Sequence, residues 1–304
     1  MSYRRASPTY WAPVNSDVRR KQRAVCALAT AHHPFECTSM DRAKHVTLKL
    51  QRAQEHIEQL GREVGAFYAT RPYRVAHRRD PVSKRLTYYV ASVTAVPEHL
   101  ALVAGDTIQN LMSALDHLAF QLVCADTSDR PPNPRWIYFP IADTQSDYDE
   151  KKAGKMNGAS SETMSAIDAL APFRSGSTAL WKLYRLNNID KHRLLLTAGS
   201  QAAGIHLGQM MAPLLKGTFP PEAVDAMTTM NHFLMPADRG FPLTAGFELY
   251  HTAPDEQPNE SLPFRFAVAL NEPGVVEGED LLTTMSDLSQ AVKQAVDSLL
   301  PRLK

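Results

Sequence analysis

The chain has 304 residues, of which 44% are hydrophobic and 21% are charged, and its formal net charge is +1. These values are ordinary for a globular protein, and the length suits one large domain or two smaller ones. No apolar run approaches the roughly 20 residues that a membrane-spanning helix needs. We therefore expect a protein that does not enter a membrane.

The charge is unevenly distributed. Residues 1–39 carry a net charge of +4, which leaves −3 for the rest. A mildly acidic body argues against a broad nucleic-acid surface but leaves room for a local basic patch. The three cysteines, Cys26, Cys37 and Cys124, form no disulfide framework and no zinc-binding spacing. We expect a reducing, cytoplasmic location and predict neither a metal nor a cofactor.

Residues 1–39 show no sustained helical or alternating pattern. Our hypothesis is that they form a disordered tail or that Met40 is the natural start of the protein. A basic arm that binds nucleic acid is the functional alternative. We predict that residues 40–304 form a single domain.

A long helix is predicted from Asp41 to about Thr70. Its apolar residues form a heptad seam, made of Val46, Leu50, Ala53, Ile57, Leu60, Val64 and Phe67. A narrow seam indicates packing along another helix, and the best partner within the chain is the helix predicted for residues 98–125. An intermolecular coiled coil is the competing interpretation.

Strand-forming residues at 73–77 and 86–93 predict a β-hairpin whose loop contains Asp80-Pro81. Further on we predict a short strand at 136–139, an exposed loop at 143–161, helices at 162–170 and 178–192, and a buried strand at 194–197. After residue 200 the pattern favours strands at 203–207, 245–251 and 264–270, with little periodicity over 216–244. A last helix covers about 278–300. This order predicts an α+β fold in which long packed helices, as a helical hairpin or bundle, cover a largely antiparallel sheet.

The helix predicted from Glu98 to Ala125 has an unusual polar face. Its apolar stripe is Ala104, Ile108, Leu111, Leu115, Leu118 and Leu122. The other side carries Asp106, Asn110, Ser113 and His117, spaced four, three and four, with Asp116 beside them. No Lys, Arg or Glu occurs from His99 to Asp129, although long charged side chains are usual on a solvated face. This face is either covered by another segment or lines a cleft, or it is a half-exposed face whose short side chains cap loops.

A second polar cluster, LNNIDKHRLLL, lies where a predicted helix is followed by a strand. Asn188 and His192 are one turn apart, and Asp190, Lys191 and Arg193 lie between or beside them. An ordinary charged helix end explains these residues as well. If the two clusters converge, a histidine beside carboxylates can act as a general acid or base. We therefore assign His117, Asp116 and His192 as candidate catalytic residues and the following as candidate binding residues: Asp106, Asn110, Ser113, Asn188, Asp190, Lys191 and Arg193.

The familiar nucleotide-binding, hydrolase and zinc motifs are absent from the sequence. The blocks GDTIQNLMSALDHLAFQLV and LNNIDKHRLLL, in contrast, resemble the two hallmark blocks of a widespread group of uncharacterised bacterial proteins. The resemblance extends from about Met40 to Gly199. In that group the first block typically reads GD…NLRSALDHL.

The Arg-x4-His in that typical block is similar to the motif of HEPN-domain ribonucleases and toxins. In those proteins the His and Arg of paired helical bundles act on an RNA phosphate. His117 matches the His, but Met112 occupies the position of the Arg. The loss of a guanidinium that contacts developing charge is typically worth several kcal/mol, so Arg185 or Arg193 replaces it, or the site is not a ribonuclease, or this copy is inactive.

Three hypotheses follow. The first is a HEPN-like RNA-acting protein of a toxin or defence system, with His117 as acid or base and a homodimer as the assembly. The second is a non-catalytic module that binds a small ligand or a partner segment. In the third, the polar face is purely structural and bonds to loop backbone.

Overall fold

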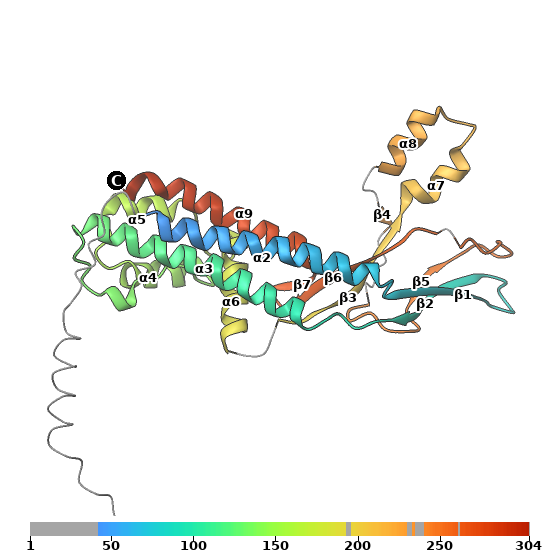
Figure 1. Ribbon diagram of the computed structural model, residues 1–304, viewed down its shortest axis with the longest axis horizontal. Coiled ribbons are helices and arrows are strands. Elements are labelled where there is room, and N and C mark those ends of the chain that lie inside the picture. The colour runs from blue at the N-terminus through green and yellow to red at the C-terminus, as the bar shows by residue number, and fades with distance from the viewer. Residues whose placement is uncertain (1–41, 193–195, 230–232, 235–239, 261, 304) are drawn as a thin grey trace, which may run out of the picture. The chain divides into compact units, whose positions relative to one another are not determined.

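A computed structural model describes residues 42–192, 196–229, 233–234, 240–260 and 262–303, and by their contacts residues 39–304 group into one unit. The long helices lie together at one end of this unit and the antiparallel strands lie at the other, with two short helices beside them, so the predicted α+β class is confirmed (Figure 1). The predictions for residues 1–39, as a tail, an arm or a misassigned start, lie outside the described residues.

Two long helices, α2 (Lys44–Ala69) and α3 (His99–Asp126), pack along one another, as the seam predicts. All six residues of the predicted α3 stripe are fully buried. In α2 the seam residues are buried except Leu50 and Ile57, which are half-buried and pack against the same core. Hydrophobic burial between these two faces is the main stabilising contribution to this pair.

A third long helix, α9 (Leu281–Leu299), packs against both α2 and α3. Its first turn is capped by Asp280, whose Oδ1 accepts a hydrogen bond from the Thr283 amide at 2.8 Å. The helix continues into a 3-10 turn, η2 (Leu300–Leu303). The final helix predicted for 278–300 therefore begins three residues later, after a strand that the sequence did not reveal.

The first sheet has the order β1-β2-β5, with all pairs antiparallel. It contains β1 (Tyr73–Arg79), β2 (Leu86–Val93) and β5 (Glu248–His251). The predicted hairpin is confirmed: Asp80 Oδ1 accepts hydrogen bonds from the amides of Val82 at 3.0 Å and Ser83 at 2.6 Å. This side-chain acceptor organises the turn between β1 and β2.

The second sheet has the order β4-β3-β6-β7 and is also antiparallel. It contains β3 (Ala198–His206), β4 (Phe233–Leu234), β6 (Phe264–Glu272) and β7 (Val276–Asp280). The strands thus form two sheets, where we predicted one. Val90 of β2 and Ala202 of β3 share a small core with Leu243, which joins the two sheets.

The last turn of α2 is bonded to the second sheet through Tyr68. Its hydroxyl accepts a hydrogen bond from the Val268 amide at 3.0 Å and donates one to the Phe266 carbonyl at 3.3 Å. Burial raises the pKa of Tyr68 to about 12, so the phenol stays protonated at neutral pH.

Two predictions about short elements were wrong. Residues 143–161, predicted as a loop, contain α4 (Gln145–Lys155), which Thr144 caps. Only Tyr148 of this helix is buried, so its sequence has almost no apolar period to detect. Residues 136–139 are not a strand; a 3-10 turn, η1 (Pro134–Trp136), precedes an extended segment.

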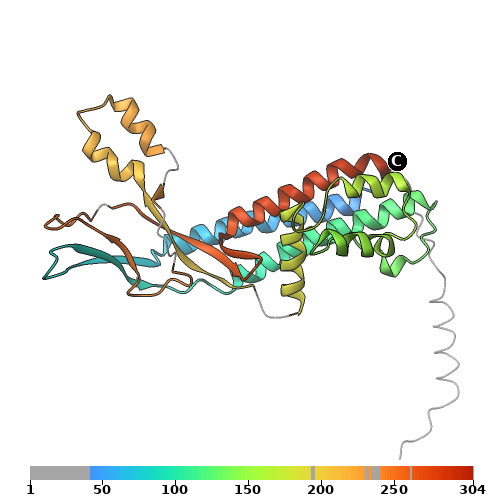
Figure 2. The ribbon, with the colours of Figure 1, turned by 180° about the vertical axis from the view of Figure 1, so that it is seen from behind.

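The helices α5 (Ser161–Asp168) and α6 (Thr178–His192) lie where they were predicted. Figures 1 and 2 show α6 running across the long helices. Of the strand predicted at 194–197, residues 196 and 197 are unassigned and β3 begins at 198, while 194 and 195 lie outside the described residues. Two further helices, α7 (Leu207–Leu215) and α8 (Pro221–Thr229), were not predicted. Across the described ranges, no helix has both the length and the apolarity to cross a membrane.

Candidate functional site

Polar side chains of α3 lie on two parallel stripes of residues, each spaced four, three and four. The α6-side stripe is Gly105, Gln109, Met112 and Asp116, and the α2-side stripe is Asp106, Asn110, Ser113 and His117. This spacing keeps each stripe on one line along the helix. The two stripes have different neighbours and must be considered separately.

The two motif blocks meet at Gly105. A Cβ built on Gly105 would lie 2.6 Å from Oδ1 of Asp190 in α6, so the missing side chain lets the carboxylate approach the helix. Burial and the neighbouring Asp106 carboxylate raise the pKa of Asp190 above its ordinary value. The predicted convergence of the blocks therefore occurs here, through Gly105, Asp106 and Asp190.

Asp116 has a different environment, one turn after Met112. Its Oδ1 accepts a hydrogen bond from the buried Phe139 amide at 3.0 Å. Burial raises the pKa of Asp116, while that hydrogen bond and the Lys191 and Lys155 ammonium groups oppose the rise. These contacts give Asp116 a structural explanation, because it anchors the segment that follows η1.

Lys155, at the end of α4, reinforces this anchor. Its ammonium donates to the Ile141 carbonyl at 3.0 Å and lies 5.6 Å from the centre of the Tyr184 ring. Burial lowers the pKa of Lys155, and the nearby Asp116 carboxylate partly restores it. On the α6-side stripe, Asp116 is thus held by a bond to backbone and lies near two lysine charges.

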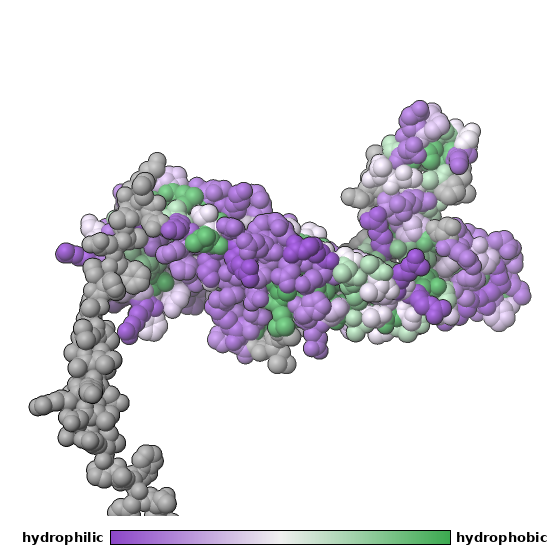
Figure 3. Space-filling view, viewed as in Figure 1, coloured by the Kyte–Doolittle hydropathy of each residue, from purple (hydrophilic) through white to green (hydrophobic). Residues whose placement is uncertain are grey.

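The α2-side stripe is half-open and lies beside basic groups of α2. Asn110 Oδ1 accepts a hydrogen bond from Lys49 Nζ at 3.2 Å, and Asn110 Nδ2 donates to the Asp106 carbonyl at 2.8 Å. The rings of His117 and His45 lie 6.1 Å apart, tilted by 55°. His45 is exposed, whereas Lys49, Asn110 and His117 are half-buried. The surface over α2 and α3 in this view is mainly hydrophilic (Figure 3).

The surroundings of His117 favour its neutral form. Burial, with smaller contributions from the Lys49 ammonium and the His45 ring, lowers the pKa of His117 below its ordinary value of 6.5. A neutral imidazole that remains partly accessible can accept a proton near neutral pH. We call His45, Lys49, Asn110 and His117 the seam cluster.

Of the remaining predicted residues, Ser113 lies on the same stripe as Asn110 and His117, whereas Asn188, Lys191 and His192 lie on α6. Ser113 accepts a hydrogen bond from Gln109 at 3.4 Å and is half-buried. At the end of α6, Asn188 is half-buried, whereas Lys191 and His192 are exposed. Arg193 lies outside the described residues. The ring that His117 contacts is His45, and within the described chain no ring contact joins His117 to His192.

Gly105 and His117 are separated along α3 by about 18 Å, at 1.5 Å per residue. The predicted site is thus divided between two places on the helix. Asp106 and Asp190 lie at one of them and His117 lies at the other. The α2 residues His45 and Lys49 complete the second place.

Arg185 and Arg193 were the predicted replacements for the missing arginine, and Arg193 lies outside the described residues. Met112 is buried, at 6% exposure, and it belongs to the α6-side stripe. Arg185 bonds instead to Asp143, at 3.4 Å. Lys49 is the basic group that the structure brings to His117.

The sequence contained a signal for the two missed residues. His45 and Lys49 are four residues apart and each directly precedes a seam residue, Val46 and Leu50. A residue that flanks a seam lies beside the partner helix, where e and g positions of coiled coils make their contacts. The seam predicted the packing of the two helices but not the placement of His45 and Lys49 beside His117.

No three side chains of the metal-binding kinds gather anywhere in the described part of the chain. Comparison with protein-family models, with curated proteins and with solved structures finds no match to this chain. The chemistry of the site must therefore be argued from its own geometry.

Proposed function

We propose that the chain acts on RNA by cleaving a phosphodiester at the seam cluster. The observation that carries this proposal is the placement of two imidazoles, His45 and His117, 6.1 Å apart with the Lys49 ammonium beside them. Two histidines can divide the roles of base and acid, and a lysine can stabilise the charge that develops on a phosphate. The resemblance to HEPN-domain ribonucleases supports the same substrate class.

In this proposal His117 is the general base, because its lowered pKa keeps it neutral at pH 7. It removes the proton from a ribose 2′-hydroxyl, whose oxygen attacks the adjacent phosphorus. The bond from phosphorus to the 5′-oxygen breaks, and a protonated His45 donates a proton to that oxygen. The products are a 2′,3′-cyclic phosphate and a free 5′-hydroxyl, so no water or metal is consumed in the step.

Lys49 then takes the part that the motif gives to an arginine. Its ammonium, which donates to Asn110 Oδ1 at 3.2 Å, is fixed beside His117. A lysine offers a point charge where a guanidinium would offer a two-pronged contact, so we expect slower cleavage than an arginine would support. Met112, which is 6% exposed, stands at the position where the motif has its arginine.

The experiment compares cleavage of a fluorophore-labelled single-stranded RNA by the wild type and by His117→Ala, His45→Ala and Lys49→Ala. The matched control is His192→Ala, an exposed histidine outside the seam cluster. We expect losses of about 100-fold or more for the two histidine variants, the usual contribution of acid–base catalysis. The control variant should keep full activity.

Cleavage that survives His117→Ala would overturn the proposal. RNA binding that Lys49→Ala abolishes, in a protein that never cleaves, would replace catalysis by the non-catalytic binding alternative. The resemblance also implies a homodimer, and light scattering of the cleaving protein tests this. A cleaving monomer would remove the dimer from the proposal and leave the seam cluster in place.

A further inference from the structure

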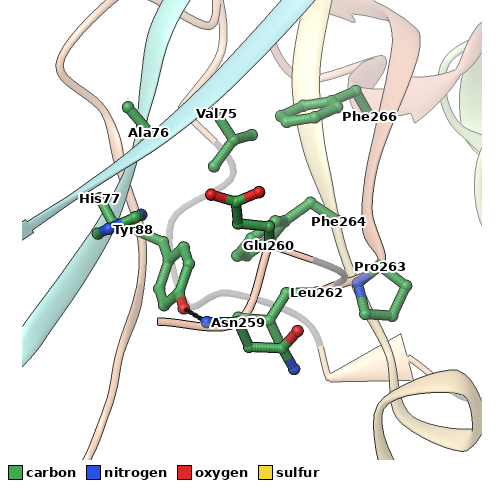
Figure 4. A pocket seen from close by; sticks show the side chains of 10 residues that line it. All are labelled: Val75, Ala76, His77, Tyr88, Asn259, Glu260, Leu262, Pro263, Phe264 and Phe266. Atoms are coloured by element: carbon green, nitrogen blue, oxygen red, sulfur yellow. Dashed lines mark hydrogen bonds between the residues drawn. The ribbon is translucent and has the colours of Figure 1, made fainter. Parts of the chain in front are cut away.

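A cavity of about 630 Å³ opens between the two sheets, and none of the residues of the seam cluster lines it. Figure 4 shows its lining from β1, β2, β6 and the segment that precedes β6. The lining residues are mostly apolar or aromatic, and the ones that matter here are Val75, Tyr88, Glu260, Leu262, Phe264 and Phe266. A volume of this size suits a small organic molecule.

The aromatic wall is fixed by packing. Phe264 and Phe266 are two residues apart on β6 and therefore project from the same face. Phe266 stacks on Tyr73 with ring centres 4.3 Å apart, and Tyr88 lies 5.7 Å from Phe264. These contacts hold the rings in place before any ligand arrives, which reduces the entropy lost on binding.

Tyr88 is fixed at its polar end as well. Its hydroxyl accepts a hydrogen bond from the Asn259 amide at 2.7 Å, and the residue is only 3% exposed. The bond joins the segment before β6 to β2. The residue that follows in this segment, Glu260, is thereby positioned at the cavity.

Glu260 places a carboxylate among these rings. Figure 4 shows its carboxyl group between Val75 and the two phenylalanines, pointing into the cavity. Arg78, on the adjoining strand, is engaged elsewhere, because it pairs with Glu248 and lies over the Tyr89 ring at 5.2 Å. Arg79 donates to the carbonyls of Lys84 and Glu256, both at 2.6 Å. The cavity therefore presents the Glu260 carboxylate, several aromatic rings and the His77 imidazole, whose ring lies 5.7 Å from that of Tyr88.

We propose that this cavity binds an organic cation, with a trimethylammonium or alkylammonium head group against Tyr88, Phe264 and Phe266 and its charge balanced by Glu260. Aromatic faces attract cations through the ring quadrupole. A carboxylate adds a direct opposite charge at the same place. An anion would be repelled by Glu260, and a metal ion would find a single carboxylate among apolar walls. This inference is independent of the RNA proposal, since it uses none of the same residues.

The experiment titrates the full chain by isothermal calorimetry with choline and with 3,3-dimethyl-1-butanol, which has the same shape but no charge. We expect choline to bind at least 10-fold more tightly than its neutral analogue. Glu260→Gln should reduce choline binding by 10-fold or more, while Glu150→Gln, an exposed residue of α4, should leave it unchanged. Phe264→Leu should also weaken choline binding, because it retains an apolar side chain but loses the ring.

Equal binding of choline and the neutral analogue would overturn the proposal, as would the absence of choline binding to the wild type. If Glu260→Gln bound choline as tightly as the wild type, the Glu260 carboxylate would not balance the charge of the ligand, and the proposal would be contradicted. Phe264→Leu is first checked by circular dichroism. If that variant unfolds, Glu260→Gln, which changes an exposed residue, still decides the question.

Discussion

The two stripes of α3 each carry an aspartate and an amide side chain, yet their surroundings differ. On the α6 side, Asp116 bonds to a backbone amide and Asp190 covers Gly105, so these polar groups hold elements together. On the α2 side, His117 and Asn110 are half-buried and face His45 and Lys49 across a partly open seam. The role of a short polar side chain on a helix therefore depends on what it contacts. A hydrogen bond to backbone indicates a structural role, whereas contact with accessible ionisable groups is compatible with a catalytic role.

The largest expected effect comes from a substitution on the α6-side stripe. Gly105→Val would place a branched side chain where Asp190 Oδ1 lies 2.6 Å from the built Cβ, and α6 would have to move. We expect a loss of about 2–3 kcal/mol in the free energy of unfolding, the cost of overpacking. Urea denaturation followed by circular dichroism measures it. The control is Gly61→Ala in α2, where nothing lies within 4 Å of the built Cβ, and there we expect a gain of up to about 1 kcal/mol. A Gly105→Val variant as stable as the wild type would contradict the close packing of α6 on α3.

A smaller effect sharpens the structural explanation of Asp116. Asp116→Ala leaves the Phe139 amide without its acceptor, and we expect a loss of about 1–3 kcal/mol in the free energy of unfolding. Asp116→Asn keeps an acceptor oxygen and replaces a carboxyl group whose pKa is raised by burial. We therefore expect Asp116→Asn to lower the free energy of unfolding much less than Asp116→Ala does. If both variants instead kept full stability while RNA cleavage disappeared, Asp116 would belong to the catalytic residues.

The smallest expected effect is the pH dependence of stability that comes from His117 on the α2-side stripe. Because the folded pKa of His117 lies below its unfolded value of about 6.5, the native state binds fewer protons than the unfolded chain between these two values. Stability from this group is therefore complete above pH 6.5 and is lost as the pH falls through the folded pKa. Proton NMR titration of the His117 ring gives the folded value directly. Lys49→Met removes one cause of the shift and should move the titration upward, and an unchanged titration would place Lys49 away from the ring.

Periodicity predicted the long helices because their apolar faces are continuous. The α2 seam, the α3 stripe and the full span of α6 all follow from it. It could not find α4, whose one buried residue leaves no period, nor the division of the strands into two sheets, which depends on pairings between distant residues such as Tyr89 and Glu248.

The candidate site was less predictable than the fold. Residue types identified His117, Asn110 and Asp106, and the pairing of helices was foreseen. The apolar pattern did not place His45 and Lys49 at the site, because these residues lie just outside the apolar seam. The separation of Asp116 from His117 depends on which neighbour each one faces, and adjacent positions in a helix point about 100° apart.

Tyr68 covers part of the edge of β6 that β7 leaves unpaired. Among the described strands, β7 pairs with β6 only at 269–272, which leaves the stretch before it open on that side. Tyr68 occupies this stretch by engaging both the Phe266 carbonyl and the Val268 amide, as a neighbouring strand would. Unpaired backbone at a sheet margin recruits foreign β-segments and promotes aggregation. A single phenol from the end of a helix thus occupies two of the backbone positions that an added strand would need.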